Sequence, residues 1–528
     1  MPAAVPAPPA PPAPPAPPAP PPRPTRRPRR RRGALLALLI AAPLVVVVAA
    51  VAIWFAFNSG RPTPAAAGSI PATQALRIPE LAPSSMVDGV RVFHLEAAEG
   101  RSAFLPGLST PTLGYEGDYL GPTLVAERGE KVRVEVDNAL DEETSVHWHG
   151  MHLPAAMDGG PHSPIPPGER WAPEWTIDQP AATLWYHPHL HERTREQVDA
   201  GLAGMFLVTD PEEASLALPR AYGVDDIPLI VQDRSFASDG AFGGGLSMQF
   251  DGVLGDRILV NGTLAPYLDV STELVRLRLL NGSSARMYDF AFADGREFDL
   301  VATDGGLLAA PVASSSIPLS PGERAEIVVA LAPGDRVSLV STAPDPALHA
   351  GGAAFDVLEL RAGASLAASP PVPAKLADLP APDAADAVTE RAFEMSGHEI
   401  NGAEMDMSRA DAVVTVDTAE VWTVVNDNPL PHSFHVHDTQ FRVLSIDGEP
   451  PPPRLSGYKD TIALEWDREY RILVRFDDYA DPTTPYMYHC HLLWHEDQGM
   501  MGQFLVVEPG DEPALKSPEG DDDDRHDH

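Results

Sequence analysis

The feature that most constrains this chain is its single cysteine, Cys490, which stands between His489 and His491. Because the 528 residues hold no second cysteine, an intrachain disulfide is impossible, and a lone thiol between two histidines favours a metal site. The aromatic residues before Cys490 and the turn-like sequence after it predict a β-strand over residues 486–491. Since side chains alternate between the faces of a strand, Cys490 should point one way and both histidines the other.

The two faces of this strand suit two different kinds of metal site. On one face, the Cys490 thiolate, the imidazole of His495, a second imidazole and a weak thioether from Met500 would form the His₂Cys set with axial Met of an electron-transfer copper site. On the other face, His489 and His491 lie about 6.6 Å apart along the strand, which suits two neighbouring ions better than one. One strand could therefore connect a copper with a copper cluster. The alternative is that these residues merely pack in a core.

Three further histidine pairs have the same spacing of i and i+2. A single pair of this kind is weak evidence, because buried or exposed histidines fall at that spacing by chance. Together with His489 and His491 they make four pairs, which predict a cluster of metal ions bound by these eight histidines. His432 and His495 are then left for the Cys490 site. The three further pairs are His147 with His149, His187 with His189, and His435 with His437.

The segments that contain these histidines resemble the three-domain multicopper oxidases, the family of laccases, bilirubin oxidases and bacterial cuprous oxidases. The resemblance covers about residues 78–510 and rests on the motifs HWHG, WYHPHLH with QVDAGLAGMFLV behind it, HSFHVHDTQFRVL, GYKDT and HCHLLWHEDQGMM. It implies an all-β fold of three cupredoxin-like Greek-key β-sandwich domains. It also implies four copper ions, one of type 1, one of type 2 and two of type 3.

The same resemblance implies a ligand set, and every ligand position of the family is occupied in this chain. The implied ligands of the type 1 copper are His432, Cys490, His495 and axial Met500. Those of the type 2 copper are His147 and His435. One type 3 copper would take His149, His187 and His489, and the other would take His189, His437 and His491.

The activity implied by the resemblance couples one-electron oxidation of a reducing substrate at the type 1 copper to the four-electron reduction of dioxygen to water at the trinuclear cluster. Because this reduction consumes protons in a buried site, nearby carboxylates should deliver them. Asp158 and Glu496 match the family positions for that role. The alternative is that Asp158 caps a turn and Glu496 faces solvent.

The predicted reductants are phenols, aromatic amines, pigments or metal ions, because an axial thioether from Met500 lowers the potential of the type 1 copper relative to an apolar residue. A cuprous oxidase for copper tolerance is an alternative, but Asn428 and Leu430 replace the Asp and Met that such enzymes carry before the first type 1 histidine, and their Met-rich insertion is missing. A non-catalytic copper-binding envelope protein is a second alternative. A copper nitrite reductase would lack the His-Cys-His set.

The body of the chain divides into three predicted β-sandwich units of short alternating strands, residues 78–215, 224–362 and 386–510. The metal-site histidines fall in the first and third units. The middle unit holds none of them, and since its only histidine is His349, we predict a structural role for it. A linker rich in Ala and Pro, residues 363–385, would let the third unit return to the first.

The N-terminal segments predict a membrane anchor. Residues 1–33 form a Pro/Arg-rich cytoplasmic tail, residues 34–57 an apolar single-pass signal anchor, and residues 58–77 a linker, which would place the catalytic body outside the cytoplasm. Secretion after signal cleavage is the alternative. The end of the chain, residues 511–528, is predicted to be an acidic disordered tail. The chain has 75 acidic and 38 basic side chains. Because such an acidic protein repels the phosphate backbone, we predict that nucleic acid is not a partner.

Overall fold

The computed structural model describes residues 71–243, 246–249, 252–343 and 353–515, all within one compact unit, Thr63–His528. The predicted tail and anchor over residues 1–57 lie outside this described part, as does most of the predicted C-terminal tail. None of the helices within the described ranges is long and apolar enough to cross a bilayer. The anchor over residues 34–57 therefore stays a prediction, which fractionation of cells carrying the full chain would test.

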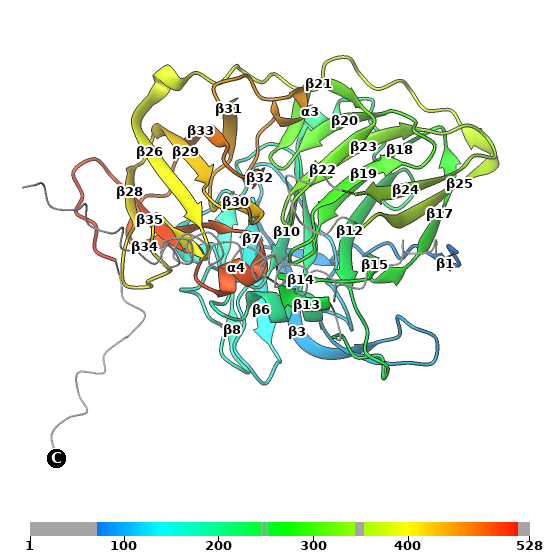
Figure 1. Ribbon diagram of the computed structural model, residues 1–528, viewed down its shortest axis with the longest axis horizontal. Helices are drawn as coiled ribbons and strands as arrows, with labels where there is room; N and C mark the ends of the chain where they lie inside the picture. The colour runs from blue at the N-terminus through cyan, green and yellow to red at the C-terminus, as the bar shows by residue number, and fades with distance from the viewer. Residues whose placement is uncertain (1–70, 244–245, 250–251, 344–352, 516–528) are drawn as a thin grey trace, which may run out of the picture. The chain divides into compact units, whose positions relative to one another are not determined.

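The described residues are mainly β-strands, as predicted, and Figure 1 shows them gathered into sheets. The first third of the chain forms two sheets. One contains β2 (Ser84–Val87), β3 (Val90–Ser102), β4 (Thr110–Tyr115), β6 (Lys131–Asn138), β8 (Arg170–Trp171) and β9 (Glu174–Thr176). The other has the order β5 (Leu124–Glu127), β11 (Gly204–Thr209), β10 (Ala182–His187), β7 (His147–His149).

The middle of the chain forms a second pair of sheets. One has the order β1 (Gln74–Ala75), β17 (Pro266–Thr272), β25 (Phe355–Ala367), β24 (Arg336–Thr342), β19 (Tyr288–Phe292), β22 (Ser316–Leu319). The other has the order β16 (Thr263–Leu264), β15 (Arg257–Val260), β12 (Asp226–Arg234), β18 (Leu274–Asn281), β23 (Arg324–Ala330), β20 (Phe298–Thr303), β21 (Gly306–Ser314). A separate hairpin joins β13 (Leu246–Gln249) to β14 (Gly252–Leu254). Strand β1 lies within the range predicted as the first linker, and β25 extends five residues into the second.

The last part forms a third pair of sheets. One has the order β27 (Glu399–Ile400), β26 (Ala387–Ser396), β29 (Thr418–Asn426), β33 (Glu469–Phe476), β31 (Phe441–Ile446). The other has the order β28 (Ala412–Thr415), β35 (Met501–Val507), β34 (Asp481–Cys490), β30 (His432–Val436), β32 (Thr461–Leu464). Short helices connect the strands: α2 (Thr194–Ala200), α3 (Pro211–Ala214), α4 (Leu493–Asp497), and the 3₁₀ turns η1 (Ala155–Met157), η3 (Ala384–Asp386) and η4 (Pro453–Leu455).

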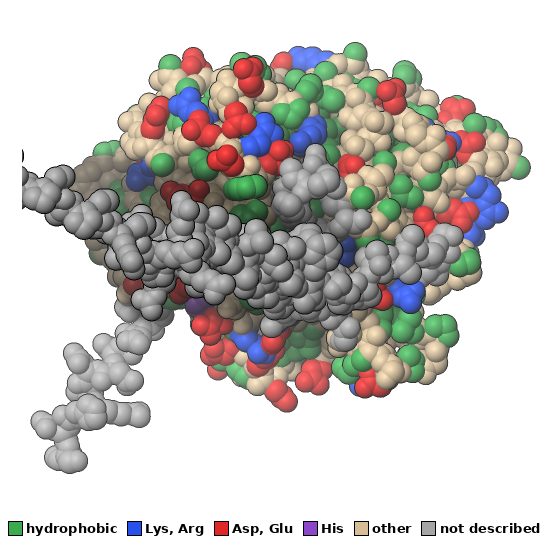
Figure 2. Space-filling view, viewed as in Figure 1, with side chains coloured by type: hydrophobic (Ala, Val, Ile, Leu, Met, Phe, Trp, Pro, Cys, Tyr) green, Lys and Arg blue, Asp and Glu red, His purple; other side chains and the backbone are tan. Residues whose placement is uncertain are grey.

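Alternation of apolar and polar residues produces these sandwiches. In β6, Val132, Val134 and Val136 are fully buried, while the charged residues between them are only partly covered. This period-two pattern places one face of the strand against a core and the other toward solvent. Each pair of sheets encloses its own large cluster of buried apolar side chains. The outer faces carry charge, and acidic side chains are prominent on the face shown in Figure 2, as a net charge of −37 leads one to expect.

A buried ion network joins the first and middle sandwiches. Glu326, on β23, accepts hydrogen bonds from Arg276 Nε (2.8 Å), from Arg278 Nη1 (2.8 Å) and from Thr183 Oγ1 (2.6 Å) on β10. Burial alone would raise the pKa of Glu326, but the two guanidinium groups outweigh it and lower that pKa from 4.5 to about 2. The carboxylate therefore stays ionised and paired at neutral pH.

Replacing Glu326 by Gln is expected to lower the free energy of unfolding by about 3 kcal/mol at neutral pH, because it removes a negative partner that two buried cations share. The folded-state pKa of Glu326 is depressed, so its contribution is present above about 4.5 and is lost as the pH falls toward 2. Urea unfolding of wild type and variant at several pH values measures this difference. The matched control is Glu390→Gln, which breaks an exposed pair with Arg471 and should cost less than about 1 kcal/mol. Equal costs for the two variants would contradict the prediction.

Candidate metal centre

The Cys490 thiol lies at the end of β34 in contact with two imidazoles. Its Sγ is 3.6 Å from Nδ1 of His432, on the neighbouring strand β30, and 3.6 Å from Nδ1 of His495, in α4. Helix α4 begins shortly after the strand ends, and its single turn brings His495 back to the sulfur. All three side chains are fully buried, and their donor atoms lie within 4.8 Å of one another.

Met500 lies beside this site. Its backbone N–H donates to the carbonyl of His495 (2.9 Å), and its own carbonyl accepts from the N–H of Cys490 (3.0 Å). The side chain of Met500 is fully buried. The structure thus brings together all four residues that the sequence grouped around the thiol, namely His432, Cys490, His495 and Met500.

The other eight predicted histidines come from two sheets, one in the first sandwich and one in the third. Strand β7 pairs with β10 so that His147 lies opposite His187, and β30 pairs with β34 so that His435 lies opposite His489. Each pair spaced i and i+2 therefore projects from the edge of its sheet in the same direction. All eight side chains are at most 1% exposed.

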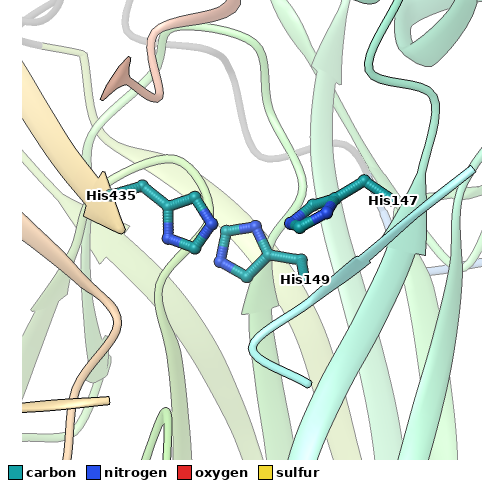
Figure 3. A group of neighbouring side chains, drawn as sticks. All are labelled: His147, His149 and His435. Carbon is teal, nitrogen blue, oxygen red and sulfur yellow. The ribbon is translucent and has the colours of Figure 1, made fainter. Parts of the chain in front are cut away.

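These eight histidines form three groups, two of which share His149, and the donor atoms within each group lie within 4.8 Å of one another. Figure 3 shows one of them, with His147 and His149 on one side and His435 facing them from the other. The rings of His149 and His435 stack at 3.8 Å between centroids. The groups are His147 with His149 and His435, His149 with His187 and His491, and His189 with His437 and His489.

The predicted division of the histidines needs one correction. We expected His489 to join His149 and His187, and His491 to join His189 and His437. The structure exchanges the two, so that His491 belongs with His149 and His489 with His189. His489 lies near the end of β34 and His491 directly follows the strand, and which ion each can reach depends on how the first sandwich packs against the third.

The hydrogen bonds of the imidazoles fix which ring nitrogen carries the proton. Five rings place Nδ1 within hydrogen-bond distance of a backbone carbonyl or a carboxylate oxygen, so Nδ1 donates and Nε2 is left with a free lone pair. These contacts are His147 to Asp158 O (3.1 Å), His187 to Pro188 O (2.8 Å), His435 to Asp460 O (2.9 Å), His437 to Asp158 Oδ2 (2.7 Å) and His489 to Cys490 O (3.1 Å).

The unprotonated Nε2 atoms of several of these histidines point toward one another, as the ligands of a metal ion do. Nε2 of His489 lies 3.1 Å from Nε2 of His189 and 3.2 Å from Nε2 of His437. The two unprotonated nitrogens of His437 and His489 would repel each other unless a cation lies between them. Within the described residues, Nε2 of His147 and Nε2 of His435 are buried without any hydrogen-bond partner. Buried imidazoles with one nitrogen tied to an oxygen and the other unpaired are typical metal ligands.

The protonation states also suit copper. Burial, and in most cases the neighbouring imidazoles, lower the pKa of His149, His187, His189, His432, His435, His437 and His491 well below 6.5, and that of His489 to about 3. These rings are therefore neutral and able to bind a cation at pH 7. Burial raises the pKa of Cys490 to about 12, so its thiol ionises at neutral pH only when a cation binds the sulfur.

Asp158 and Glu496 both lie against metal-site histidines. Asp158 Oδ2 accepts from Nδ1 of His437 at 2.7 Å, and its Oδ1 is 3.3 Å from Nδ1 of His147. Glu496 is 1% exposed, with its carboxyl oxygens 3.5 Å from Nδ1 of His189 and 3.3 Å from Nδ1 of His489. The alternative that Glu496 faces solvent is therefore wrong. Burial raises the pKa of Glu496 well above its usual range.

Two residues that contact the histidines received no role from the sequence. Asp460 Oδ1 and Thr461 Oγ1 each lie 3.1 Å from Nε2 of His149. Both stand in the GYKDT motif, which contributed to the family resemblance but contains no metal ligand. The only signal in the sequence was the place of these two residues in a motif that resembles the family.

Comparison with known proteins agrees with this geometry. Family models described as "Multicopper oxidase" match residues 96–213 and 371–510. The chain is 37% identical over 437 residues to the multicopper oxidase mco of Staphylococcus epidermidis, covering 81% of this chain and 92% of the relative. It is also 36% identical over 425 residues to the cell division protein FtsP of Edwardsiella tarda, covering 77% and 88%.

Solved structures agree on the fold. A bacterial laccase-like multicopper oxidase, CueO, from the lignin-degrading Ochrobactrum sp. superposes with a TM-score of 0.76 and 37% identity. The match covers 82% of this chain and the whole of that chain. The Ochrobactrum protein has oxidase activity toward lignin model compounds and lignosulfonate. The body of the present chain thus has a cupredoxin-like, multi-domain fold.

Proposed function

Since the chain belongs to the multicopper oxidase family and is a copper oxidoreductase, we propose that it is a laccase-like oxidase with four copper ions, one of type 1, one of type 2 and two of type 3. When bound, these ions would take single electrons from a reducing substrate and pass four of them to dioxygen, forming water. The observation that carries the proposal is the convergence of unprotonated, buried imidazole nitrogens beside a buried His₂Cys group.

The ligand assignment follows the three histidine groups and the thiol group. We assign His432, Cys490, His495 and axial Met500 to the type 1 copper. His147 and His435 would hold the type 2 copper, because their Nε2 atoms are unpaired within the described residues. For the type 3 pair we assign His149, His187 and His491 to one ion and His189, His437 and His489 to the other.

The backbone around Cys490 connects the thiol site to both histidine groups of the type 3 pair. His489 belongs to one group and His491 to the other, and each is joined to Cys490 by a single peptide bond. Nδ1 of His489 also donates to the carbonyl of Cys490 (3.1 Å). The chain thereby offers a short covalent route for electrons from the thiolate to either side of the cluster.

Protons would reach the cluster through the two buried carboxyl groups. Glu496 lies between His189 and His489 on one side, and Asp158 lies between His147 and His437 on the other. Because burial raises the pKa of Glu496, its carboxyl holds a proton to higher pH than an exposed glutamate and can release it when charge develops nearby.

The residues around His432 favour organic reductants over cations. Its Nε2 faces away from the thiol and lies 3.3 Å from Nδ2 of Asn428. A neutral amide at this position attracts a cuprous ion less than a carboxylate would, whereas it can hydrogen-bond a phenol or an aromatic amine. We therefore place phenols, aromatic amines or pigments ahead of metal ions as substrates, with cuprous oxidation as the alternative.

Copper loading of the purified protein is the test of this proposal. We expect roughly four copper ions per chain, a strong visible thiolate-to-copper absorption, and oxygen consumption when a phenol is added. The control is the same protein after chelation, which should lose both the colour and the oxygen consumption. Colourless protein with one copper or none would contradict the oxidase assignment. It would favour a non-catalytic role, for which the identity to the cell division protein FtsP is the specific support.

A further inference from the structure

The middle sandwich carries no metal-site histidine within the described residues, yet one of its turns lies against the histidine cluster. Ser320 Oγ is 2.8 Å from Oγ of Ser433, on β30, and Ser433 Oγ donates to the carbonyl of Pro321 (3.1 Å). A Cβ on Gly322, whose φ is +86°, would come within 3.0 Å of the His491 ring. The turn that precedes β23 therefore packs directly on a proposed metal ligand, in a way that only glycine permits.

Arg324, the first residue of β23, joins all three sandwiches. It is fully buried, and its two terminal nitrogens donate to the carboxylate of Asp460, Nη1 to Oδ1 (2.7 Å) and Nη2 to Oδ2 (2.6 Å). Its Nε donates to the carbonyl of Thr183, on β10 of the first sandwich (2.8 Å). Such a planar fork holds a carboxylate in one orientation.

Asp460, whose carboxylate this fork holds, hydrogen-bonds to two metal-site histidines, one through its side chain and one through its backbone carbonyl. Asp460 Oδ1 accepts from Nε2 of His149 (3.1 Å), and the carbonyl of Asp460 accepts from Nδ1 of His435 (2.9 Å). With its proton on Nε2, His149 keeps a lone pair on Nδ1, which lies 3.4 Å from Nε2 of His187 in the same metal group. The ion pair, together with Thr461 Oγ1, which also lies 3.1 Å from Nε2 and donates to Asp460 Oδ1, thus sets which nitrogen of His149 faces the cluster.

The residue after His149 shows how closely the ion pair packs. Gly150 has a φ of +85°, and a Cβ there would lie 2.5 Å from Nη2 of Arg324 and 2.6 Å from Oδ2 of Asp460. Only a glycine at this position of the HWHG motif leaves space for the ion pair between Arg324 and Asp460. The strand end that carries His149 is confined between its own sheet and this ion pair.

We propose that Arg324 is a positioning residue for the copper cluster, acting through Asp460 to fix the ring orientation and the protonated nitrogen of His149. The middle sandwich then has a direct part in assembling the metal site, beyond linking its neighbours. This inference rests on the proposed copper cluster, since it concerns ligands of two of its ions.

A purely structural ion pair would behave differently, and the chain contains one for comparison. Arg278, also in the middle sandwich and 7% exposed, makes an equivalent fork to Asp226, with Nε to Oδ1 at 2.7 Å and Nη2 to Oδ2 at 2.8 Å. Neither of these residues hydrogen-bonds to a metal-site histidine. Arg278→Lys therefore removes a buried bidentate arginine–carboxylate pair, as Arg324→Lys does, but leaves the contacts of the metal-site histidines unchanged.

The test compares Arg324→Lys with Arg278→Lys and wild type, each loaded with copper and titrated with a copper chelator. We expect Arg324→Lys to lose about 10- to 100-fold in affinity for the cluster coppers, because a lysine keeps the charge but cannot hold both oxygens of Asp460. Its blue absorption should stay at the wild-type level, and the paramagnetic resonance signal of the type 2 copper should change. Arg278→Lys should match wild type in all three measurements.

The outcomes are distinct. Wild-type-like cluster affinity and an unchanged type 2 signal in Arg324→Lys would overturn the inference while leaving the oxidase assignment intact. Absence of cluster copper from wild type itself would overturn both. If Arg324→Lys does not fold, shown by loss of the blue absorption as well, the double variant Arg324→Gln/Asp460→Asn removes both charges together and leaves no unpaired buried ion. The same selective loss of cluster copper is then expected, and its absence would overturn the inference.

Discussion

Replacing Cys490 by Ser is expected to abolish the visible blue absorption and to lower kcat by at least about 1000-fold, equivalent to about 4 kcal/mol in the activation barrier. A serine hydroxyl is a poor ligand for the copper and supplies no thiolate for the charge-transfer band. It also interrupts the route from the thiol site to His489 and His491. Because the eight histidines of the cluster are untouched, roughly three of four copper ions should remain bound.

Metal analysis, the visible spectrum and oxygen consumption with a phenol measure this result. The control is Met487→Leu, a change of similar size at another buried position of β34, which should leave colour and turnover near wild type. Turnover in Cys490→Ser within about tenfold of wild type would mean that electrons reach the cluster without the thiol. The assignment of Cys490 to the type 1 copper would then be wrong.

The sequence predicted the composition of the site better than its internal arrangement. Alternation along residues 486–491 was enough to separate Cys490 from His489 and His491, because the geometry of a strand is local and does not depend on its neighbours. The exchange of His489 and His491 between the two histidine groups could not be predicted in this way. Only the packing of two sandwiches decides which histidines each one meets.

The role of the middle sandwich was missed for a related reason. The sequence shows no metal-site histidine in it, and nothing local marks Arg324 as different from the other arginines of its strands. Its contact with Asp460 joins residues 136 positions apart, across two sandwiches. Gly150 was the one local hint, since a glycine directly after His149 indicates that something packs closely on the backbone there.

The β-sandwich character followed from composition and periodicity, and the cupredoxin-like domains followed from the family resemblance. Short strands with alternating burial, such as β6, are predicted wherever valines repeat every second residue between charged ones. The boundaries were less certain, because a two-residue strand such as β1 has no pattern of its own. It exists because residues 74 and 75 add to the edge of β17, a contact that no local signal predicts.

Glu496→Gln is expected to slow the reoxidation of the reduced protein by dioxygen by about 100- to 10,000-fold while leaving the blue absorption and the copper content unchanged. The substitution keeps the size of the side chain and its place between His189 and His489, but the amide cannot release a proton as the carboxyl does. Reduction of the protein by a phenol needs no proton at this position, so its rate should stay near wild type.

Rapid mixing of the anaerobically reduced protein with dioxygen measures the reoxidation rate as the return of the blue colour. Glu196→Gln, an exposed carboxylate on α2, is the matched control and should reoxidise like wild type. Burial raises the pKa of Glu496, so the wild-type rate should be sustained to higher pH than an exposed carboxyl would allow and fall once the carboxyl no longer holds a proton. In Glu496→Gln that decline should disappear together with most of the rate. An unchanged rate with full copper content would show that protons reach the cluster by another path. Asp158 and Asp460 are the other carboxyl groups that contact its histidines.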